Sequence, residues 1–316
     1  MDILFIGTMV VDIRALPIKD SNEWEEKQRI EQIAMSIGGD AANQAIRAAA
    51  VGKKVALCAA AGLDNNAIFL CNYLERFGVD ISYVSFKKEY STGTALVLLN
   101  DKGERNVFSV KGAHSFLSRD DLPNLEKAGD NIPRAISIGS LFSIPELEKN
   151  GLKEYLHEAK NRGILIFSDV GSDKEKKRIK GIEEFLPYID YFLPSDYESK
   201  LLTGADTVEE AAGILIEKGC RNVVIKCGAK GCYYRTSNGD EHYIKAIRVN
   251  PRDTTGAGDC MVGLFASRIL DGASIYSACR YATAGASLST LYNGASEHRI
   301  EHKNIMDFML DNDDDE

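Results

Sequence analysis

The segment Asn250–Val262, NPRDTTGAGDCMV, places three consecutive small residues where a buried helix is expected to begin. From Met261 onward, apolar residues recur at helical spacing. The first backbone N–H groups of a helix have no partner within it, and they attract anions. Because Gly256, Ala257 and Gly258 carry almost no side chain, we expect a phosphate group to approach this backbone closely.

Asp259 follows this anion-binding turn directly. A carboxylate would repel a phosphate beside it unless a neutral hydroxyl lay between them. In that arrangement the carboxylate accepts the hydroxyl proton, while the helix N-terminus stabilises the phosphoryl group in transfer. The segment therefore predicts a phosphoryl-transfer centre with Asp259 as its base, ionised by the helix dipole at neutral pH. The alternative is that Asp259 only caps the helix.

The segments around this site alternate between apolar runs and amphipathic stretches. Buried strands are predicted at residues 3–7, 54–62, 135–140, 164–170, 191–195 and 222–228. Helices are predicted at residues 41–51, 65–77, 152–161 and 208–218. This order implies an α/β fold of three layers, with a mainly parallel sheet between helices and ligand sites at the carboxyl ends of its strands.

Two segments, about residues 13–36 and 92–111, interrupt this alternation. The second reads as a hairpin around the turn NDKGER, and we interpret both as a small antiparallel β lid. Residues 1–310, with these lid segments included, are expected to form one principal domain. Residues 311–316 are too acidic to pack and are predicted to be disordered.

The composition is that of a soluble globular protein, with 44% hydrophobic and 27% charged residues and a net charge of −9. The one dense basic run, residues 174–180, reads as a solvated helix face, so nucleic acid is not an expected partner. A membrane is not expected either, because no apolar run approaches the length of a membrane span. With no signal peptide apparent, we expect a cytoplasmic protein. Seven scattered cysteines read as buried free thiols rather than as a metal site.

The motif DTTGAGD closely resembles the signature of the ribokinase (PfkB) family of carbohydrate kinases, in which the last aspartate is the catalytic base. Three further segments resemble family motifs in the family's order: GGDAANQAIRAAAVG, LPSDYESKLLTG and VIKCGAKGCYY. The resemblance covers nearly the whole chain. It implies a ribokinase-like fold and an ATP-dependent kinase that uses Mg²⁺ and acts on a sugar.

The resemblance also implies which residues bind the acceptor sugar. Gly38 and Gly39 would allow the backbone to approach it, while Asp40 and Asn43 would hydrogen-bond its hydroxyl groups. Asp12, just after the first strand, matches the family's early sugar-binding aspartate. From the residues alone, Asp40 is equally suited to cap the helix that follows it.

On the nucleotide side, the resemblance assigns Glu198 to Mg²⁺, through water, although an ordinary place on a helix surface is the alternative. Ser195 stands where the family usually has asparagine, and Lys226 where threonine is common. Lys226 would bring positive charge to the phosphates of ATP. Gly228 and Gly231 would form the turn that lies against those phosphates.

Three further residues complete the assignments made by resemblance. Thr283 falls in the region that lines the adenine. Asp253 and Thr255 match positions linked to a monovalent cation in some relatives. The remainder of that cation site, around residues 293–298, matches poorly.

The leading hypothesis is therefore a kinase for a small neutral sugar, of fructose or ribose type, which forms a homodimer through its lid. A keto-deoxy sugar acid is a less favoured acceptor, because residues 171–173 offer its carboxylate no arginine. A nucleoside kinase of the same fold is the runner-up, with Trp24, Phe108 and Phe116 as stacking partners for the base. A catalytically silent sugar-binding protein is disfavoured because Asp259 is present.

Overall fold

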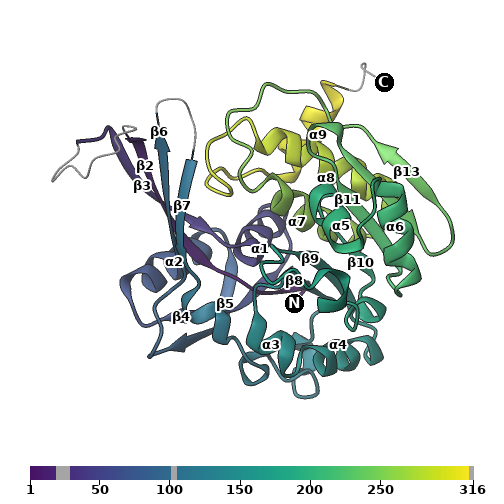
Figure 1. Ribbon diagram of the computed structural model, residues 1–316, viewed down its shortest axis with the longest axis horizontal. Helices are drawn as coiled ribbons and strands as arrows, with labels where there is room; N and C mark the ends of the chain where they lie inside the picture. Colours follow the sequence, from purple (N-terminus) through teal and green to yellow (C-terminus); the bar gives the residue numbers. More distant parts are fainter. Residues whose placement is uncertain (19–28, 101–104, 313–316) are drawn as a thin grey trace.

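The computed structural model describes residues 1–18, 29–100 and 105–312. Within them, a nine-stranded sheet lies between two layers of helices, and a four-stranded sheet stands out from the body of the molecule (Figure 1). The three-layer α/β fold expected from the sequence is confirmed. No helix among the described residues is both long and apolar enough to cross a membrane.

The large sheet has the strand order β13-β12-β11-β10-β9-β8-β1-β4-β5. Its strands are β1 (Ile3–Ile6), β4 (Val55–Gly62), β5 (Val79–Lys87), β8 (Ala135–Leu141), β9 (Leu165–Val170), β10 (Tyr191–Phe192), β11 (Asn222–Lys226), β12 (Cys232–Thr236) and β13 (Glu241–Ile244). Pairing is parallel from β5 to β11, whereas β12 and β13 add an antiparallel edge. All six predicted strands are present, and each is entirely or largely buried on both faces, as parallel strands require.

The helices divide between the two faces of this sheet. One face carries α1 (Asp40–Ala50), α2 (Asn65–Arg76), α7 (Ala257–Leu270), α8 (Ile275–Ser289) and α9 (His302–Leu310). The other carries α3 (Pro145–Lys149), α4 (Leu152–Asn161), α5 (Asp196–Thr203) and α6 (Val208–Glu217). Alternate residues of each strand feed the two cores: Ile3 and Phe5 point to the first, Leu4 and Ile6 to the second.

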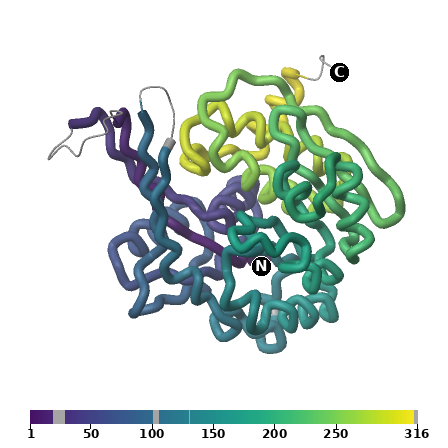
Figure 2. Tube along the Cα trace, in the orientation of Figure 1, coloured from purple at the N-terminus to yellow at the C-terminus, as the bar shows by residue number. Residues whose placement is uncertain are grey.

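Two helices far apart in the sequence lie side by side on the first face. Figure 2 shows α1, in purple, against α7, in green, and many residue pairs join them. Gly263 of α7 permits this approach, because a Cβ there would collide with the backbone of Gln44. The N-termini of both helices consequently open toward the same space, above the carboxyl ends of the central strands.

The small sheet has the strand order β3-β2-β6-β7. Its strands are β2 (Val10–Ile18), β3 (Gln32–Gly38), β6 (Thr94–Asn100) and β7 (Arg105–Val110). Two antiparallel pairs, β2–β3 and β6–β7, are joined by parallel pairing of β2 with β6. The small β element expected from the sequence is present, although Trp24, the hairpin turn at 101–104 and the tail at 313–316 lie outside the described residues.

Candidate active site

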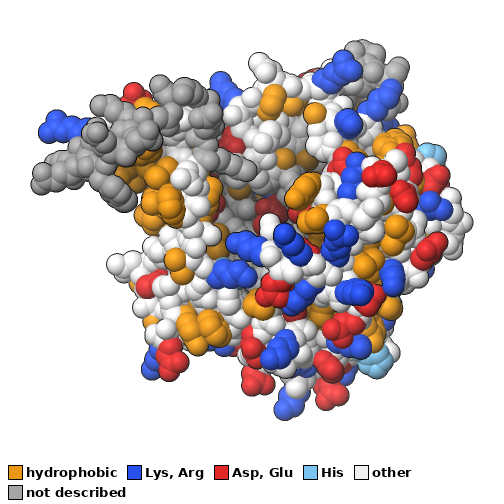
Figure 3. Space-filling model, in the orientation of Figure 1, with side chains coloured by type: hydrophobic (Ala, Val, Ile, Leu, Met, Phe, Trp, Pro, Cys, Tyr) orange, Lys and Arg blue, Asp and Glu red, His pale blue; other side chains and the backbone are white. Residues whose placement is uncertain are grey.

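Two cavities meet at the N-terminus of α7. One, of about 570 Å³, lies between the small sheet and the strand ends β8 and β9; we call it the small-sheet cavity. The other, of about 630 Å³, lies along α7 and α8 and is called the α7–α8 cavity. Ser195, Lys226 and Gly258 line both. In Figure 3, acidic side chains are visible at the bottom of the hollow beside the small sheet.

Asp259 lines the small-sheet cavity from the first turn of α7. Its Oδ2 accepts a hydrogen bond from Asn43 Nδ2 at 3.0 Å, and its Oδ1 one from Gln44 Nε2 at 3.4 Å. It makes no capping hydrogen bond, since α7 is capped by the left-handed Gly256. The capping interpretation of Asp259 is therefore wrong: α1 holds the carboxylate toward the cavity.

Burial raises the pKa of Asp259 well above its usual value, and the nearby carboxylate of Asp40 raises it further. The Asn43 amide and the Lys226 ammonium oppose this effect without reversing it. Desolvation at this buried position therefore opposes the effect of the helix dipole, which was expected to favour the ionised form of Asp259. The proton affinity of the group is raised, which makes it a stronger base than an ordinary aspartate.

The turn at residues 256–258, where an anion hole is predicted, packs closely against Ala295 through Gly256. Gly256 has φ 72°, and a Cβ there would collide with Ala295. Gly258 faces both cavities and is clear of backbone contacts. The N–H of Ala257 donates to the Thr254 carbonyl at 3.3 Å, so that group is already engaged. Of the predicted anion hole, the backbone of Gly256 and Gly258 is thus left to meet a phosphate.

Asp40 is the first residue of α1 and lines the small-sheet cavity. The helix is capped instead by Gly39, at φ 94°, while the Thr8 hydroxyl accepts a hydrogen bond from the Asp40 N–H at 3.1 Å. The Asp40 carboxylate accepts a hydrogen bond from Ser140 at the end of β8. The capping interpretation of Asp40 is also wrong, and its carboxylate is available to a ligand in the cavity.

Asn43 and Asp12 do not line this cavity, although both lie close to it. The Asn43 amide is used within the protein: Nδ2 donates to Asp259, and Oδ1 accepts from Ser296 at 3.0 Å. Asp12 lies on β2 in the space that a side chain on Gly38 would fill. Burial raises the pKa of Asp12 to about 6. In this structure the Asn43 amide therefore orients the Asp259 carboxylate.

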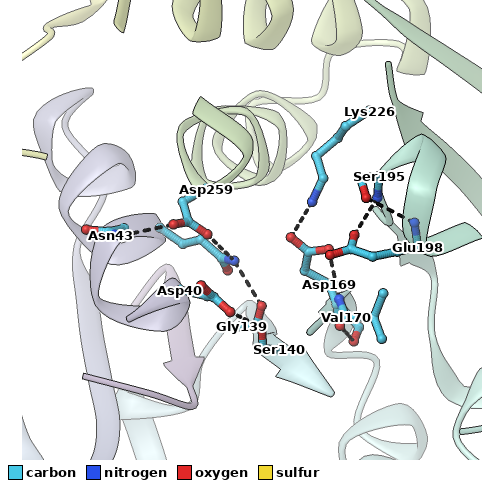
Figure 4. A network of polar contacts seen from close by, with 12 residues as sticks. Asp40, Asn43, Gly139, Ser140, Asp169, Val170, Ser195, Glu198, Lys226 and Asp259 are labelled. Atoms are coloured by element: carbon cyan, nitrogen blue, oxygen red, sulfur yellow. Dashed lines mark hydrogen bonds and ion pairs between the residues drawn. The ribbon is translucent and has the colours of Figure 1, made fainter. Parts of the chain in front are cut away.

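On the opposite side of the cavity, Lys226 forms a buried ion pair with Asp169 (Figure 4). Burial raises the pKa of Asp169 to about 7, even though the Lys226 charge lowers it. Glu198 Oε2 accepts a hydrogen bond from the Ser195 N–H at 2.7 Å, and the Ser195 hydroxyl accepts one from the Glu198 N–H at 3.2 Å. This capping box fixes both side chains at the start of α5.

The remaining residues expected near a nucleotide line the α7–α8 cavity. Gly228 and Gly231 form the turn between β11 and β12, both with positive φ, and a Cβ on Gly231 would collide with the Ile244 carbonyl. Thr283 of α8 is buried, with its hydroxyl 3.4 Å from the sulfur of Cys232. The structure thus brings these three residues into one cavity next to Lys226.

Asp253 and Thr255 lie outside both cavities, on the outer side of the turn that leads into α7. Asp253 Oδ1 accepts a hydrogen bond from the Thr255 N–H at 2.9 Å. Its Oδ2 accepts one from the Gly294 N–H, also at 2.9 Å. The pair therefore joins the turn at 253–256 to the loop at 293–298.

Sequence reasoning missed two residues of this site. Asp169 comes at the end of β9, in the run FSDV, and a carboxylate at a strand's carboxyl end is the signal that could have found it. Gln44 is buried next to Asn43 and also donates to the Gly139 carbonyl at 3.1 Å. A buried glutamine beside a predicted ligand offers no comparable signal.

Residues 1–302 match the model of the pfkB family carbohydrate kinases. The chain is 28% identical over 302 residues to the deoxyribokinase of Salmonella typhimurium, covering 93% of this chain and 94% of that one. Two solved structures are similar in fold. The putative ribokinase II from E. coli, in complex with ATP and Mg²⁺, has TM-score 0.82, 23% identity and coverage of 98% and 99%. The aminoimidazole riboside kinase from Salmonella enterica, complexed with aminoimidazole riboside and an ATP analogue, has TM-score 0.78, 22% identity and coverage of 98% and 100%.

The match to the family model extends over most of the chain and includes both cavities. Asp259, the small-residue turn before it and the carboxylates of α1 and α5 all fall within it. The chain therefore belongs to the pfkB family of carbohydrate kinases and is an ATP-dependent phosphotransferase.

Proposed function

We propose that this kinase transfers the γ-phosphoryl group of ATP to a hydroxyl of a small neutral sugar of ribose or fructose type. The observation that carries the proposal is the position of Asp259 where the two cavities meet. The small-sheet cavity takes the acceptor, and the α7–α8 cavity takes ATP. Gly258 and Lys226 line both, so they lie where a phosphoryl group would pass from one to the other.

On the acceptor side, Asp259 accepts the proton of the hydroxyl that attacks. The amides of Asn43 and Gln44 fix the orientation of its carboxylate. A carboxylate remains a weak base compared with an alkoxide, so the proton moves late, as the loose transition state forms. Asp40 accepts a hydrogen bond from a second hydroxyl of the sugar and so positions it for attack.

On the donor side, Lys226 supplies positive charge to the phosphates, and the backbone of Gly256 and Gly258 stabilises the charge on the group in transfer. The residues present suit Mg²⁺, which prefers one or two carboxylates together with water and phosphate oxygens. Glu198 lies close enough to Asp169 to raise the pKa of the Asp169 carboxyl group. When bound, Mg²⁺ would neutralise phosphate charge; Glu198 would hold it through water.

A neutral acceptor is supported by the polar groups at the strand ends. Gly171 and Ser172 line the cavity there, and among the described residues no arginine lines it to make a bidentate contact to a carboxylate. Lys111 and Lys174 also line it, but both are exposed and act as point charges in water. A sugar acid therefore remains the less favoured acceptor.

A nucleoside is the second candidate, because Phe142 lines the small-sheet cavity and could stack on a base. Phe108 and Phe116, the residues considered for this role from the sequence, do not line the cavity. Phe116 stacks instead on Tyr90, with ring centroids 3.6 Å apart. Trp24 lies outside the described residues.

The small sheet would act as a lid over the acceptor. Val10, Thr94, Ala95, Ser109 and Val110 of this sheet line the small-sheet cavity. A kinase must favour an alcohol over water as acceptor, and covering the site excludes water. The sugar-independent hydrolysis of ATP should therefore stay low while the sheet covers the cavity.

The opposite face of the small sheet is apolar and exposed. One row of neighbouring side chains crosses the four strands: Met35 on β3, Ile13 on β2, Leu96 on β6 and Phe108 on β7. Met35, Leu96 and Phe108 are exposed, and so is Ile33 in the next row. Exposed apolar clusters of this kind mark protein interfaces. A homodimer through this face is the proposed assembly.

A screen for ADP release tests the proposal, with ribose, deoxyribose and fructose, a keto-deoxy sugar acid, and adenosine and inosine as acceptors. We expect the highest kcat/KM with a neutral sugar, at least about tenfold above the nucleosides, since a pocket built to bind hydroxyl groups discriminates strongly. Activity confined to nucleosides would replace the proposal with the second candidate. Activity confined to the sugar acid would overturn the choice of a neutral acceptor.

A further inference from the structure

Two arginine side chains hold the loop at residues 293–298, which packs against Gly256 through Ala295. Arg47 of α1 is almost fully buried and donates to the carbonyls of Ala295 and His298, each at 2.6 Å. Arg14 of β2 donates to Glu297 Oε1 at 2.8 Å. Both guanidinium groups therefore act on the loop that supports the anion hole.

Arg14 also faces the turn that leads into α7. Its Nη1 lies 3.6 Å from Asp253 Oδ2. Burial alone would raise the pKa of Asp253, but the hydroxyl and N–H of Thr255, the N–H of Gly294 and the Arg14 charge together hold it below its usual value. Asp253 is therefore an ionised link between the two loops, and Arg14 is its counter-charge.

This arrangement does not suit the monovalent cation expected at Asp253 and Thr255. Such a cation needs carboxylate and carbonyl oxygens directed at it. Asp253 Oδ2 already accepts from Gly294 and faces Arg14, and the carbonyls of Ala295 and His298 already accept from Arg47. A further positive charge beside Arg14 would also be repelled.

We propose that the Arg14 guanidinium takes the place of a bound monovalent cation and holds the 253–256 turn in position for catalysis. Arg14 is a positioning residue, because it contacts neither cavity. It lies on the same face of β2 as Asp12, two residues away, and the two charges interact. The charge that holds the turn is thus carried by the small sheet itself.

The proposal predicts that K⁺ does not change the kcat or Tm of the wild-type kinase. When Arg14 is removed, both should depend on K⁺. The proposal rests on the assigned kinase activity only for its kinetic readout. Melting temperature in potassium chloride against tetramethylammonium chloride provides a readout that needs no acceptor sugar. Arg14→Ala is suited to the test because the Arg14 side chain is 24% exposed, so solvent ions can reach the space that it leaves.

For the wild type, we expect kcat to differ by less than about twofold between the two salts, and Tm to be the same. For Arg14→Ala in tetramethylammonium, kcat should fall by about 10- to 100-fold, because the turn moves relative to the substrates. Potassium or guanidinium ions should restore part of that loss, and potassium should raise the Tm of this variant specifically. Arg14→Lys should keep most of the wild-type kcat.

Arg235→Ala is the matched control, since it removes an arginine that pairs with Glu241 at the far edge of the large sheet. It should behave as the wild type in both salts. A wild type activated several-fold by K⁺ over tetramethylammonium would overturn the proposal. An Arg14→Ala variant with unchanged kcat would also overturn it. The same holds if neither potassium nor guanidinium restores the lost kcat and potassium does not raise the Tm of the variant. If no acceptor is phosphorylated, the salt-specific Tm still decides the question.

Discussion

At the scale of single residues, the structure divides the acceptor side into two roles. Asp40 faces the cavity, whereas Asn43 is buried between Asp259 and Ser296. Asp40→Ala should therefore raise the sugar KM. The expected loss of binding free energy is about 1–3 kcal/mol, the cost of leaving a polar group without its partner. Asn43→Ala should instead lower kcat, because the base loses its orienting amide. Steady-state kinetics of the two variants check this, and equal effects on sugar KM would contradict it.

The raised pKa of Asp259 predicts the pH dependence of the reaction. The base must be deprotonated to act, so log(kcat/KM) should fall as the pH drops through this pKa. An ordinary aspartate has a pKa of 3.8, and the fall in log(kcat/KM) should lie at a higher pH than that. A profile from about pH 5 to pH 9 measures it. A kcat/KM that stays constant down to about pH 5 would contradict the prediction.

The raised pKa of Asp259 also predicts how the stability of the folded protein depends on pH. A carboxyl group with a higher pKa in the folded state holds its proton more tightly there. Stability therefore falls as the pH rises from the unfolded pKa to the folded one. Asp259→Asn removes this ionisation, so the Tm of the wild type should fall relative to the variant as the pH rises through that window. Melting both proteins across the range is the measurement; a constant Tm difference would contradict the prediction.

At the scale of elements, the N-terminus of α7 separates structural from catalytic glycines. Gly256→Ala should destabilise the fold by about 1–3 kcal/mol, because the residue is left-handed and its Cβ would collide with Ala295. Gly258→Ala should fold normally, since its Cβ would meet only the Lys226 side chain, at 3.7 Å. It should nevertheless lower kcat by crowding the phosphoryl group. Thermal melts and kcat values of both variants distinguish the two roles, and the reverse pattern would contradict them.

The elements themselves were largely predictable from the sequence. The strands at residues 3–6 and 135–141 are continuous apolar runs, because both of their faces are buried. The strand at residues 79–87 was missed, because it alternates buried and exposed residues at the sheet edge and carries polar side chains. Local pattern therefore identified the central strands and failed at the periphery.

The pairing of site residues could not be predicted in the same way. Asp259 and the small residues before it form a local motif whose chemistry can be inferred. Three contacts of the site join residues that are far apart in the sequence. Asn43 and Asp259 are separated by 216 positions, Asp169 and Lys226 by 57, and Arg14 and Glu297 by 283. No local signal specifies such pairs, because they arise only when the sheet order brings the elements together.

At the scale of the whole molecule, the apolar outer face of the small sheet predicts a dimer. Phe108 is 56% exposed on that face, on the edge strand β7. Phe108→Asp should yield a monomer in sedimentation at concentrations where the wild type sediments as a dimer, because a buried unpaired charge opposes association. Val107→Asp, on the opposite face of the same strand, is the control and should leave the assembly unchanged. A monomeric wild type would exclude this assembly.

The central claim is that Asp259 is the catalytic base between the two cavities, and Asp259→Asn tests it most directly. Asparagine keeps the size of the side chain but cannot accept the proton. We expect kcat for ADP release to fall by about 10²–10⁴-fold, with the KM for ATP little changed. Asp307→Asn, an exposed carboxylate on α9, should retain full activity as the control. An Asp259→Asn variant that melts like a folded protein and keeps more than about a tenth of the wild-type kcat would contradict the account.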